Sequence, residues 1–379
     1  MKKWLLIFLM MIPALVSAET YYVRENATGT KATATNCTLA RAMSPATHDA
    51  QTYLTTDKIV ICGAITNILP PSDGVKYVAN NDLSKIGGMT LTDRKGIVFE
   101  HITFNGCITG SGGRNITFRN CKIGKCNSGV QFTSTGNIEM EQNTILTPLK
   151  ITGGKDHVIA MNVIRRVAKG VIMTNADGVI NNNWMRGRKD RMLCPVGCDC
   201  EGDLSAAPLE CKRYCSSAAI TVKGGSAVNA HHNDIKYFPR CFIVRGVNTI
   251  LNTSQNQCYE FSYDAVDADE GTINTDGNML KSTVSPKHHI RLRANGTYTG
   301  QRDLYKPKTT KFYHKNQDIN SLNEWKTITG QDTQANDGEM EPDEIQDEED
   351  PADALDSSDE EAMTIQNPLI VVDKRGRKK

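Results

Sequence analysis

The chain has 379 residues, of which 39% are hydrophobic, and its 44 Lys and Arg residues against 43 Asp and Glu residues give a formal net charge of +1. The hydrophobic content and the length are sufficient for one large folded body. After the first segment no run of 18 apolar residues occurs, so we expect no membrane span.

The first 18 residues have the pattern of a secretory signal peptide. Lys2 and Lys3 precede an apolar run from Trp4 to Leu15, and Val16-Ser17-Ala18 supplies the small residues of a cleavage site. We therefore expect a secreted protein, extracellular or periplasmic. In such a compartment the 12 cysteines favour disulfides over metal thiolates, and their even number permits complete pairing.

The charge is distributed unevenly along the chain. Residues 337–361 carry 14 acidic and no basic residues, whereas residues 362–379 carry five basic and one acidic residue. Residues 1–336 therefore have a formal charge of +11, because 14 negative and a net four positive charges are removed with the tails, and loss of Lys2 and Lys3 leaves +9. A basic exported body indicates an anionic partner, which outside the cell is more often an acidic polysaccharide than nucleic acid.

Residues 19–57 are predicted to form an N-terminal strand and cap. Tyr21-Tyr22-Val23 has the pattern of a short strand, and Cys37–Met43 that of a short helical stretch. From residue 58 to residue 312 the chain repeats.

Asparagines in the repeating region recur at intervals of 23, 19, 21, 50, 23 and 22 residues. The interval of 50 equals one repeat of about 22 residues plus an insertion of about 28. Amide side chains at this period can bond from coil to coil. The expected ladder consists of Asn120, Asn143, Asn162, Asn183, Asn233, Asn256 and Asn278.

Each repeat also holds two short runs with alternating apolar residues, bounded by Gly, Asn and Asp, which leave no room for a helix. A leucine-rich repeat is the alternative, but isoleucine and valine outnumber leucine at the repeating positions. The predicted fold is all-β: a single-stranded right-handed parallel β-helix, a solenoid of about 22-residue coils with an asparagine ladder and short helical caps.

The long repeat contains a cysteine-rich insertion at residues 186–217, which favours a disulfide-stapled loop over a zinc site. Arg188 and Arg191 contribute to its basic character, so we expect it to form one wall of a binding groove. Residues 313–330 should form a C-terminal helical cap, with a capping box at Ser321–Glu324 and Gly330 as the stop. An acidic disordered segment at 331–363 and a final strand with a basic tail at 364–379 should follow.

Alternation predicts which residues of the second run face outward. If Val222, Val244 and their counterparts are core, Lys223 and Arg245 face out on adjacent coils about 4.8 Å apart. A lysine beside a like charge has a lowered pKa and can act as a base. Arg291 and Arg293 lie in the corresponding outward positions further along.

Ile220-Thr221-Val222-Lys223-Gly224-Gly225-Ser226, followed by Phe242–Gly246, resembles the lysine and arginine coils of the chondroitinase B and alginate lyase family, within the pectate-lyase-like β-helix proteins. The resemblance implies β-elimination on a uronate polymer, with Lys223 as the base, Arg245 assisting the leaving group, and calcium neutralising the carboxylate. Ser216–Ala219 and Gly246 stand where that family has acidic ligands and a histidine, so only Lys223 and Arg245 carry over.

Other residues are candidates for binding. Asp267, Asp269 and Glu270 are hard oxygen ligands that suit calcium, the one cofactor indicated, although a solvated or salt-bridged turn also explains them. His231 and His232 adjoin the ladder, and one must face outward, where it could assist Lys223 and Arg245.

Two functions remain open at this stage. The first is a monomeric secreted protein that binds an acidic polysaccharide and cleaves it by β-elimination. The second is a non-catalytic surface, adhesive or structural β-helix protein, in which Lys223, Arg245, Asp267 and Arg291 form a charge ladder that stabilises the sheet.

Overall fold

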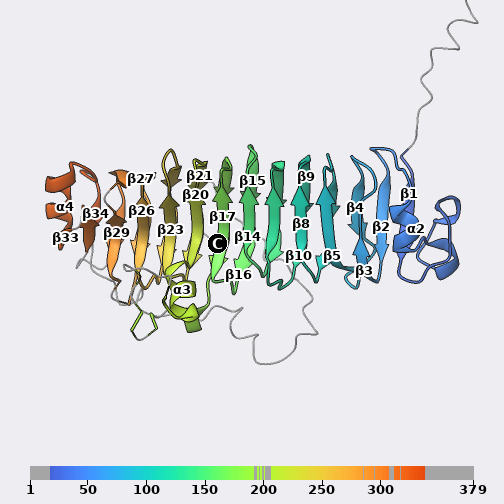
Figure 1. Cartoon of the computed structure of the whole chain (residues 1–379), viewed down its shortest axis with the longest axis horizontal. Coiled ribbons are helices and arrows are strands. Elements are labelled where there is room, and N and C mark those ends of the chain that lie inside the picture. Colours follow the sequence, from blue (N-terminus) through green and yellow to red (C-terminus); the bar gives the residue numbers. More distant parts are fainter. Residues whose placement is uncertain are drawn as a thin grey trace, which may run out of the picture. The chain divides into compact units, whose positions relative to one another are not determined.

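Figure 1 shows the computed structural model, in which successive strands stack side by side from β1 (Thr20–Arg24) to β34 (Asn336–Asp337). Within residues 1–339 the chain forms a parallel β-solenoid of about 11 turns of about 22 residues, as predicted. The structure describes residues 18–191, 194–195, 197–198, 200, 206–284, 286–293, 295–306, 311–315 and 317–337. Residues 1–17 of the predicted signal peptide, residues 338–363 of the acidic segment and the final strand lie outside these residues. Residues 331–337, which we expected to be disordered, instead contain β34 and the buried Asp332 and Ala335.

One side of the solenoid is a 12-stranded sheet, here called sheet A, in which each coil contributes one strand. Every neighbouring pair in it is parallel. Its strands are β1, β2 (Lys58–Cys62), β4 (Lys76–Ala79), β6 (Val98–Glu100), β9 (Arg114–Arg119), β12 (Gly136–Glu141), β15 (His157–Ala160), β18 (Gly178–Asn181), β21 (Ala227–His231), β24 (Ile250–Ser254), β27 (Thr272–Asp276) and β30 (Thr297–Gln301).

From β6 onward each coil adds two further strands rather than the single one expected, and these form two columns joined through β5 (Lys85–Thr92). The short column follows the ladder asparagines. It contains β7 (Thr103–Phe104), β10 (Lys122–Ile123), β13 (Thr144–Ile145), β16 (Val163–Arg165), β19 (Trp184–Arg186), β22 (Asp234–Lys236), β25 (Gln257–Tyr259), β28 (Met279–Lys281), β31 (Leu304–Lys306) and β34.

The long column carries the second predicted run of each repeat. It is parallel except for its last pair. It contains β3 (Ala64–Ile68), part of β5, β8 (Ile108–Ser111), β11 (Val130–Thr133), β14 (Leu149–Thr152), β17 (Lys169–Thr174), β20 (Ala218–Lys223), β23 (Arg240–Arg245), β26 (Asp264–Asp269), β29 (His288–Leu292), β32 (Phe312–His314) and β33 (Gln317–Ile319).

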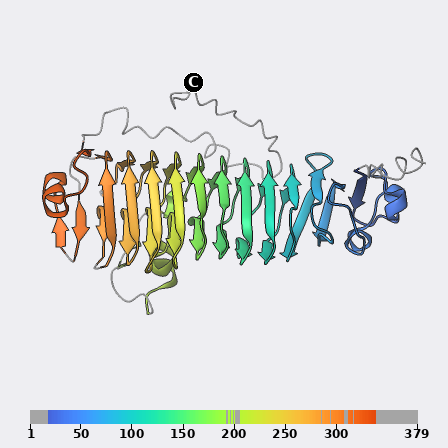
Figure 2. The ribbon, with the colours of Figure 1, turned by 90° about the horizontal axis from the view of Figure 1, so that it is seen from above.

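Short helices lie at the two ends of the solenoid and on the insertion (Figures 1 and 2). The N-terminal cap holds α2 (Pro45–Asp49) with 3-10 turns at Lys31–Thr33 and Leu39–Arg41, the latter inside the expected helical stretch. The insertion holds α3 (Leu209–Cys215) and a 3-10 turn at Lys189–Arg191. The C-terminal α4 (Leu322–Thr329) begins after Ser321, whose Oγ accepts from the Glu324 N–H at 3.2 Å, and ends at left-handed Gly330, as predicted.

The core lies inside the coils, where the inward-facing residue of one strand packs against the inward-facing residue in the same position on the next coil. The residues predicted to face inward in β20, β23, β26 and β29 are all buried, at 3% exposure or less. Aromatic rings stack along the axis at the N-terminal end, where the Phe99 and Phe118 centroids are 5.0 Å apart. Alternation therefore predicted the core correctly.

The asparagine ladder runs through the buried turn between sheet A and the short column. Each side-chain oxygen accepts from the backbone N–H and the amide of the preceding rung; Asn183 Oδ1 lies 2.9 Å from Asn162 N and 3.0 Å from Asn162 Nδ2. Asn183 in turn donates to Asn233 Oδ1 at 2.9 Å, across the 50-residue interval. The insertion therefore leaves the ladder uninterrupted.

The prediction for Asn120 was wrong. Asn120 adopts a left-handed backbone (φ 53°), and the next residue, buried Cys121, takes the rung and donates its N–H to Asn143 Oδ1 at 2.8 Å. Disulfides form, as expected, and use ten of the 12 cysteines, so pairing is not complete: Cys121 and Cys194 are not in a disulfide. The pairs are Cys37–Cys62, Cys107–Cys126, Cys198–Cys211, Cys200–Cys215 and Cys241–Cys258.

The last rung is a carboxylate, Asp303, which accepts from Asn278 N at 2.7 Å and Asn278 Nδ2 at 3.1 Å. Burial, together with the nearby charge of Asp332, raises the pKa of Asp303 to about 6. The pKa of Asp303 in the folded protein lies above the ordinary aspartate value of 3.8. Its contribution to the free energy of unfolding is therefore fully present below about pH 4 and is lost as the pH rises through about 6.

The substitution Asp303→Asn should therefore stabilise the protein at alkaline pH. Asparagine keeps the two bonds accepted from Asn278, and its Nδ2 can donate to the Thr275 and Tyr298 hydroxyls that now donate to Oδ2. Because asparagine never ionises, we expect a gain of about 2 kcal/mol near pH 8 and a smaller gain near about pH 4.5. Denaturant unfolding of the wild type and the variant at both pH values measures this. An equal effect at the two pH values would contradict the assignment.

Candidate functional site

The predicted Lys223 and Arg245 lie side by side on the outer face of the long column. The register pairs Lys223 with Arg245 and Arg245 with Asp269, so the three residues occupy one outward position on successive coils. Lys223 is exposed, whereas the Arg245 side chain is 29% exposed. The sequence thus placed both cations correctly on one face.

Asp267, a predicted calcium ligand, is instead the counterion of three arginines. Arg245 binds it through two nitrogens, and the Nε atoms of Arg240 and Arg293 lie 3.3 and 3.4 Å from its carboxylate oxygens. Burial alone would raise the pKa of Asp267, but Arg245, Arg240 and Arg293 hold it well below its usual range. Asp267 is therefore an ionised, fully buried carboxylate at working pH.

A second buried carboxylate, Asp264, extends the network. His288 Nδ1 lies 2.9 Å from Asp264 Oδ1, and Arg240 Nε and an Arg291 terminal nitrogen lie 3.4 and 3.8 Å from Oδ2. Arg291, predicted to bind substrate from an outward position, is only 2% exposed. That prediction requires correction, because the residue points outward from its strand but is covered. Tyr263 and Tyr313 contribute to this cover: an Arg291 terminal nitrogen lies 3.5 Å from the Tyr263 hydroxyl, and the guanidinium carbon lies 5.2 Å from the Tyr313 ring centroid.

The cysteine-rich insertion contacts Arg240, which belongs to the same network. The Arg240 side chain donates to the Cys215 carbonyl at 2.8 Å and stacks on Tyr263, with 4.3 Å between the guanidinium carbon and the ring centroid. Tyr214 reaches Ser262 with a 3.0 Å hydrogen bond between hydroxyls. In Figure 1, α3 projects from the solenoid beside β20 and β23. Arg240 of β23 and the Ser262 hydroxyl thus attach the insertion to the coils.

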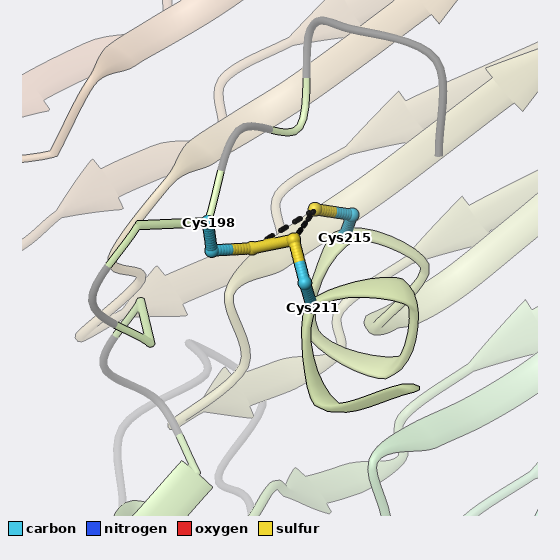
Figure 3. Close-up of side chains that lie close together, drawn as sticks. All are labelled: Cys198, Cys211 and Cys215. Carbon is cyan, nitrogen blue, oxygen red and sulfur yellow. Dashed lines mark hydrogen bonds between the residues drawn. A yellow bond between two sulfur atoms is a disulfide. The ribbon is translucent and has the colours of Figure 1, made fainter. Parts of the chain in front are cut away.

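The predicted calcium site does not form among the described residues. Asp267, Asp269 and Glu270 do not bring three ligand atoms together, since Asp267 is enclosed by arginines and Glu270 is exposed at a left-handed turn (φ 58°). The ligand-type atoms that do converge in the described chain are the sulfurs of Cys198, Cys211 and Cys215 (Figure 3).

This sulfur cluster consists of two disulfides in contact. Cys198 is bonded to Cys211 and Cys200 to Cys215, and Cys215 Sγ lies 3.6 Å from Cys198 Sγ and 3.8 Å from Cys211 Sγ. Disulfide sulfurs carry no thiolate charge, which metal binding requires. The insertion is therefore stapled by disulfides, as the sequence predicted.

Lys169 is a candidate residue that sequence analysis missed. It begins β17, one coil before Lys223, and is half-buried. Burial, together with the positive charges of Lys223 and Lys150, lowers its pKa. The available sequence signal was its distance from Ala218, the first residue of β20, with which it pairs: the two are separated by one repeat plus the insertion.

The remaining predicted residues are dispersed. His231 ends β21 in sheet A, whereas Lys223 and Arg245 lie in the long column, so the structure does not place the histidine on the same sheet as these two cations. His231 Nδ1 lies 3.0 Å from His232 Nδ1. On the insertion, Arg188 pairs with Asp190 at 2.6 Å; the Arg191 side chain is outside the described residues.

Comparison with known proteins adds no assignment. No family model, no curated protein and no solved structure matches this chain. Within the described residues, no helix is both long and apolar enough to cross a membrane. The site must therefore be interpreted from its own chemistry.

Proposed function

We propose that this chain is a secreted β-helix protein that binds an anionic, uronate-containing polysaccharide on the outer face of the long column. The observation that carries the proposal is the group of Lys150, Lys169 and Lys223 on consecutive coils. None of the ion pairs found in the described residues involves these three lysines.

Three cations held together repel one another. The pKa of Lys169 is lowered mainly by burial and further by repulsion from Lys223 and Lys150. The lysines occupy different strand positions, since Lys150 is in register with Ile172, Lys169 with Ala218 and Lys223 with Thr174. A polymer with a carboxylate on each sugar would relieve the repulsion by placing negative charges among them. Arg245 and Arg293 extend the basic face, at 29% and 26% side-chain exposure.

Hydroxyl groups continue the outward position of Lys223 toward the N-terminus. The register aligns one hydroxyl residue per coil over five coils, and four of the five are exposed. Hydroxyls donate and accept, so they suit the hydroxyls of a sugar chain. These residues are Thr92, Ser111, Thr133, Thr152 and Thr174.

The test is affinity electrophoresis in gels containing alginate, polygalacturonate or a glycosaminoglycan, at low and high salt. We expect retardation on at least one polymer that salt weakens, because screening acts on exposed charges. The double variant Lys169→Gln/Lys223→Gln should bind roughly 10-fold more weakly, whereas Lys58→Gln on sheet A should bind as the wild type does. Equal loss in both variants, or no retardation, would reject this face as the site and favour the structural role.

A catalytic role is the second candidate, favoured by the lowered pKa of Lys169. In β-elimination a neutral lysine removes the proton α to the uronate carboxylate, the electrons form a carbon–carbon double bond, and the glycosidic oxygen leaves with a proton. The resemblance assigns the base role to Lys223 and assistance to Arg245; Lys169 is an additional base candidate.

Ultraviolet absorbance of the unsaturated product, with and without calcium, tests this role. A signal lost separately in Lys223→Ala or Lys169→Ala would identify the base. Binding without any such signal would make the protein a binding module.

A further inference from the structure

A second surface of the solenoid contains a groove, and its lining is mainly uncharged and polar, unlike the basic face of the long column. The outer face of sheet A carries a groove of about 470 Å³ over β18, β21, β24, β27 and β30. Its strands lie in the C-terminal half of the solenoid, where Figure 1 labels β21 and β27. The groove does not include Lys169, Lys223 or Arg245.

The groove contains a column of amide side chains at one outward position. The register aligns Asn229, Asn252 and Asn274 on successive coils. Asn274 Nδ2 donates to Asn252 Oδ1 at 2.7 Å, and Asn252 Nδ2 donates to Asn229 Oδ1 at 2.8 Å. Unlike the buried ladder, this column is accessible: Asn229 and Asn252 are exposed and Asn274 is half-buried.

These amides keep unused hydrogen-bonding capacity. An amide has two N–H donors and two lone pairs on oxygen, and a bond to each neighbour uses only one of each in Asn252. The column therefore offers a donor and an acceptor at each coil, about 4.8 Å apart. Vicinal hydroxyls, which both donate and accept, are the matching chemistry.

The groove carries no uncompensated charge in the part that is described. Asp276, at its edge, pairs with Arg302. Burial and the neighbouring His232 lower the pKa of His231, which disfavours its charged form. Its Nδ1 already contacts His232 Nδ1, so Nε2 is the ring nitrogen left to donate or accept. A polyanion gains nothing from such a surface, in contrast to the lysines of the long column.

An apolar patch adjoins the amides. Val179 lines the groove in the outward position next to Asn229, and Val158 precedes it by one coil. Both are half-buried in a strand face that would otherwise be polar. A sugar ring presents hydroxyls at its edge and C–H groups on its faces, so a mixed amide and valine surface can contact both.

We propose that the sheet A groove is a second binding site, which takes an uncharged, hydroxyl-rich glycan chain lying along the solenoid axis. The protein would then hold a neutral and an acidic polysaccharide on two different faces, as a cross-linking protein does. The groove proposal does not depend on the lysine face.

Isothermal titration with neutral hexasaccharides tests it, using cello-, xylo-, manno- and maltohexaose. The protein should be produced in a bacterial periplasm, which permits disulfides and leaves the Asn252-Thr253-Ser254 sequence unglycosylated. We expect binding of at least one hexasaccharide, at least 10-fold weaker in Asn252→Ala and in Asn274→Ala. Thr117→Ala, at the same outward position on β9, should bind as the wild type does.

Thermal unfolding of each variant shows whether it is folded. No binding of any neutral hexasaccharide, or binding that survives both asparagine substitutions, would overturn the proposal. The Lys169→Gln/Lys223→Gln variant should keep full affinity for the hexasaccharide while losing the anionic polymer, so failure of either site is seen separately.

Discussion

Replacing Asn183 by alanine is expected to lower the free energy of unfolding by about 4 kcal/mol. Asn183 accepts two bonds from Asn162 and donates to Asn233 and to the Ile159 carbonyl at 2.8 Å, all in a buried turn. Alanine leaves these groups without partners, and each buried unsatisfied group costs about 1–3 kcal/mol. Equilibrium unfolding in guanidinium chloride measures the loss.

Asn252→Ala is the matched control, because Asn252 also bonds to an asparagine on each side but is exposed. Water replaces its lost partners, so we expect a loss of about 0.5 kcal/mol. Similar losses in the two variants would mean that the buried ladder is not what holds the coils in register.

Replacing Asp267 by asparagine is expected to cost about 3 kcal/mol. The side chain is fully buried and neutralises Arg240, Arg245 and Arg293, of which Arg240 is itself 1% exposed. An amide leaves Arg240 with the Asp264 carboxylate and removes the Asp267 ion pairs of Arg245 and Arg293. Removing one partner of a buried ion pair is costly because the other charge stays buried. Chemical denaturation near pH 7 measures it.

The pH dependence gives this prediction a second readout. The folded-state pKa of Asp267 is held well below its usual range, so its stabilisation is present above the unfolded pKa and is lost only as the pH falls through the folded value. The cost of Asp267→Asn should therefore be the same at about pH 6 and about pH 8. Asp269→Asn, in register with Arg245 but partly exposed, should cost about 0.5 kcal/mol; a cost equal to that of Asp267→Asn would contradict the assignment.

The repeat pattern predicted the solenoid because identical physical demands recur in every coil. Buried asparagines and alternating valine and isoleucine are visible at a fixed period, and so the rungs from Asn143 to Asn278 were found. Asp303 was missed because it fills a rung with a different residue type. The Asn120 error arose from an asparagine adjacent to the true rung, Cys121.

The candidate site was only partly predictable. Register alone brings Lys223 beside Arg245, since neighbouring coils align by period. The burial of Arg291 involves Tyr263 and Tyr313, and no periodicity predicted that these side chains lie against it. The sheet A groove depends on amide contacts between Asn229, Asn252 and Asn274. These residues lie in the first strand of each coil, whereas the outward-facing residues were predicted for the second run of each repeat.

The hydrogen bond from Asn183 to Asn233 continues the ladder across the insertion, so the length of this loop does not affect the register of the coils. The disulfide-stapled insertion lies at the corner between β19 and β20, and β19 still pairs in register with β22 of the next coil. The number of coils and the size of the loop at this corner can therefore change independently. Whole coils can be duplicated or deleted in units of one repeat, and foreign loops can be grafted at that corner, while the remaining rungs keep their partners.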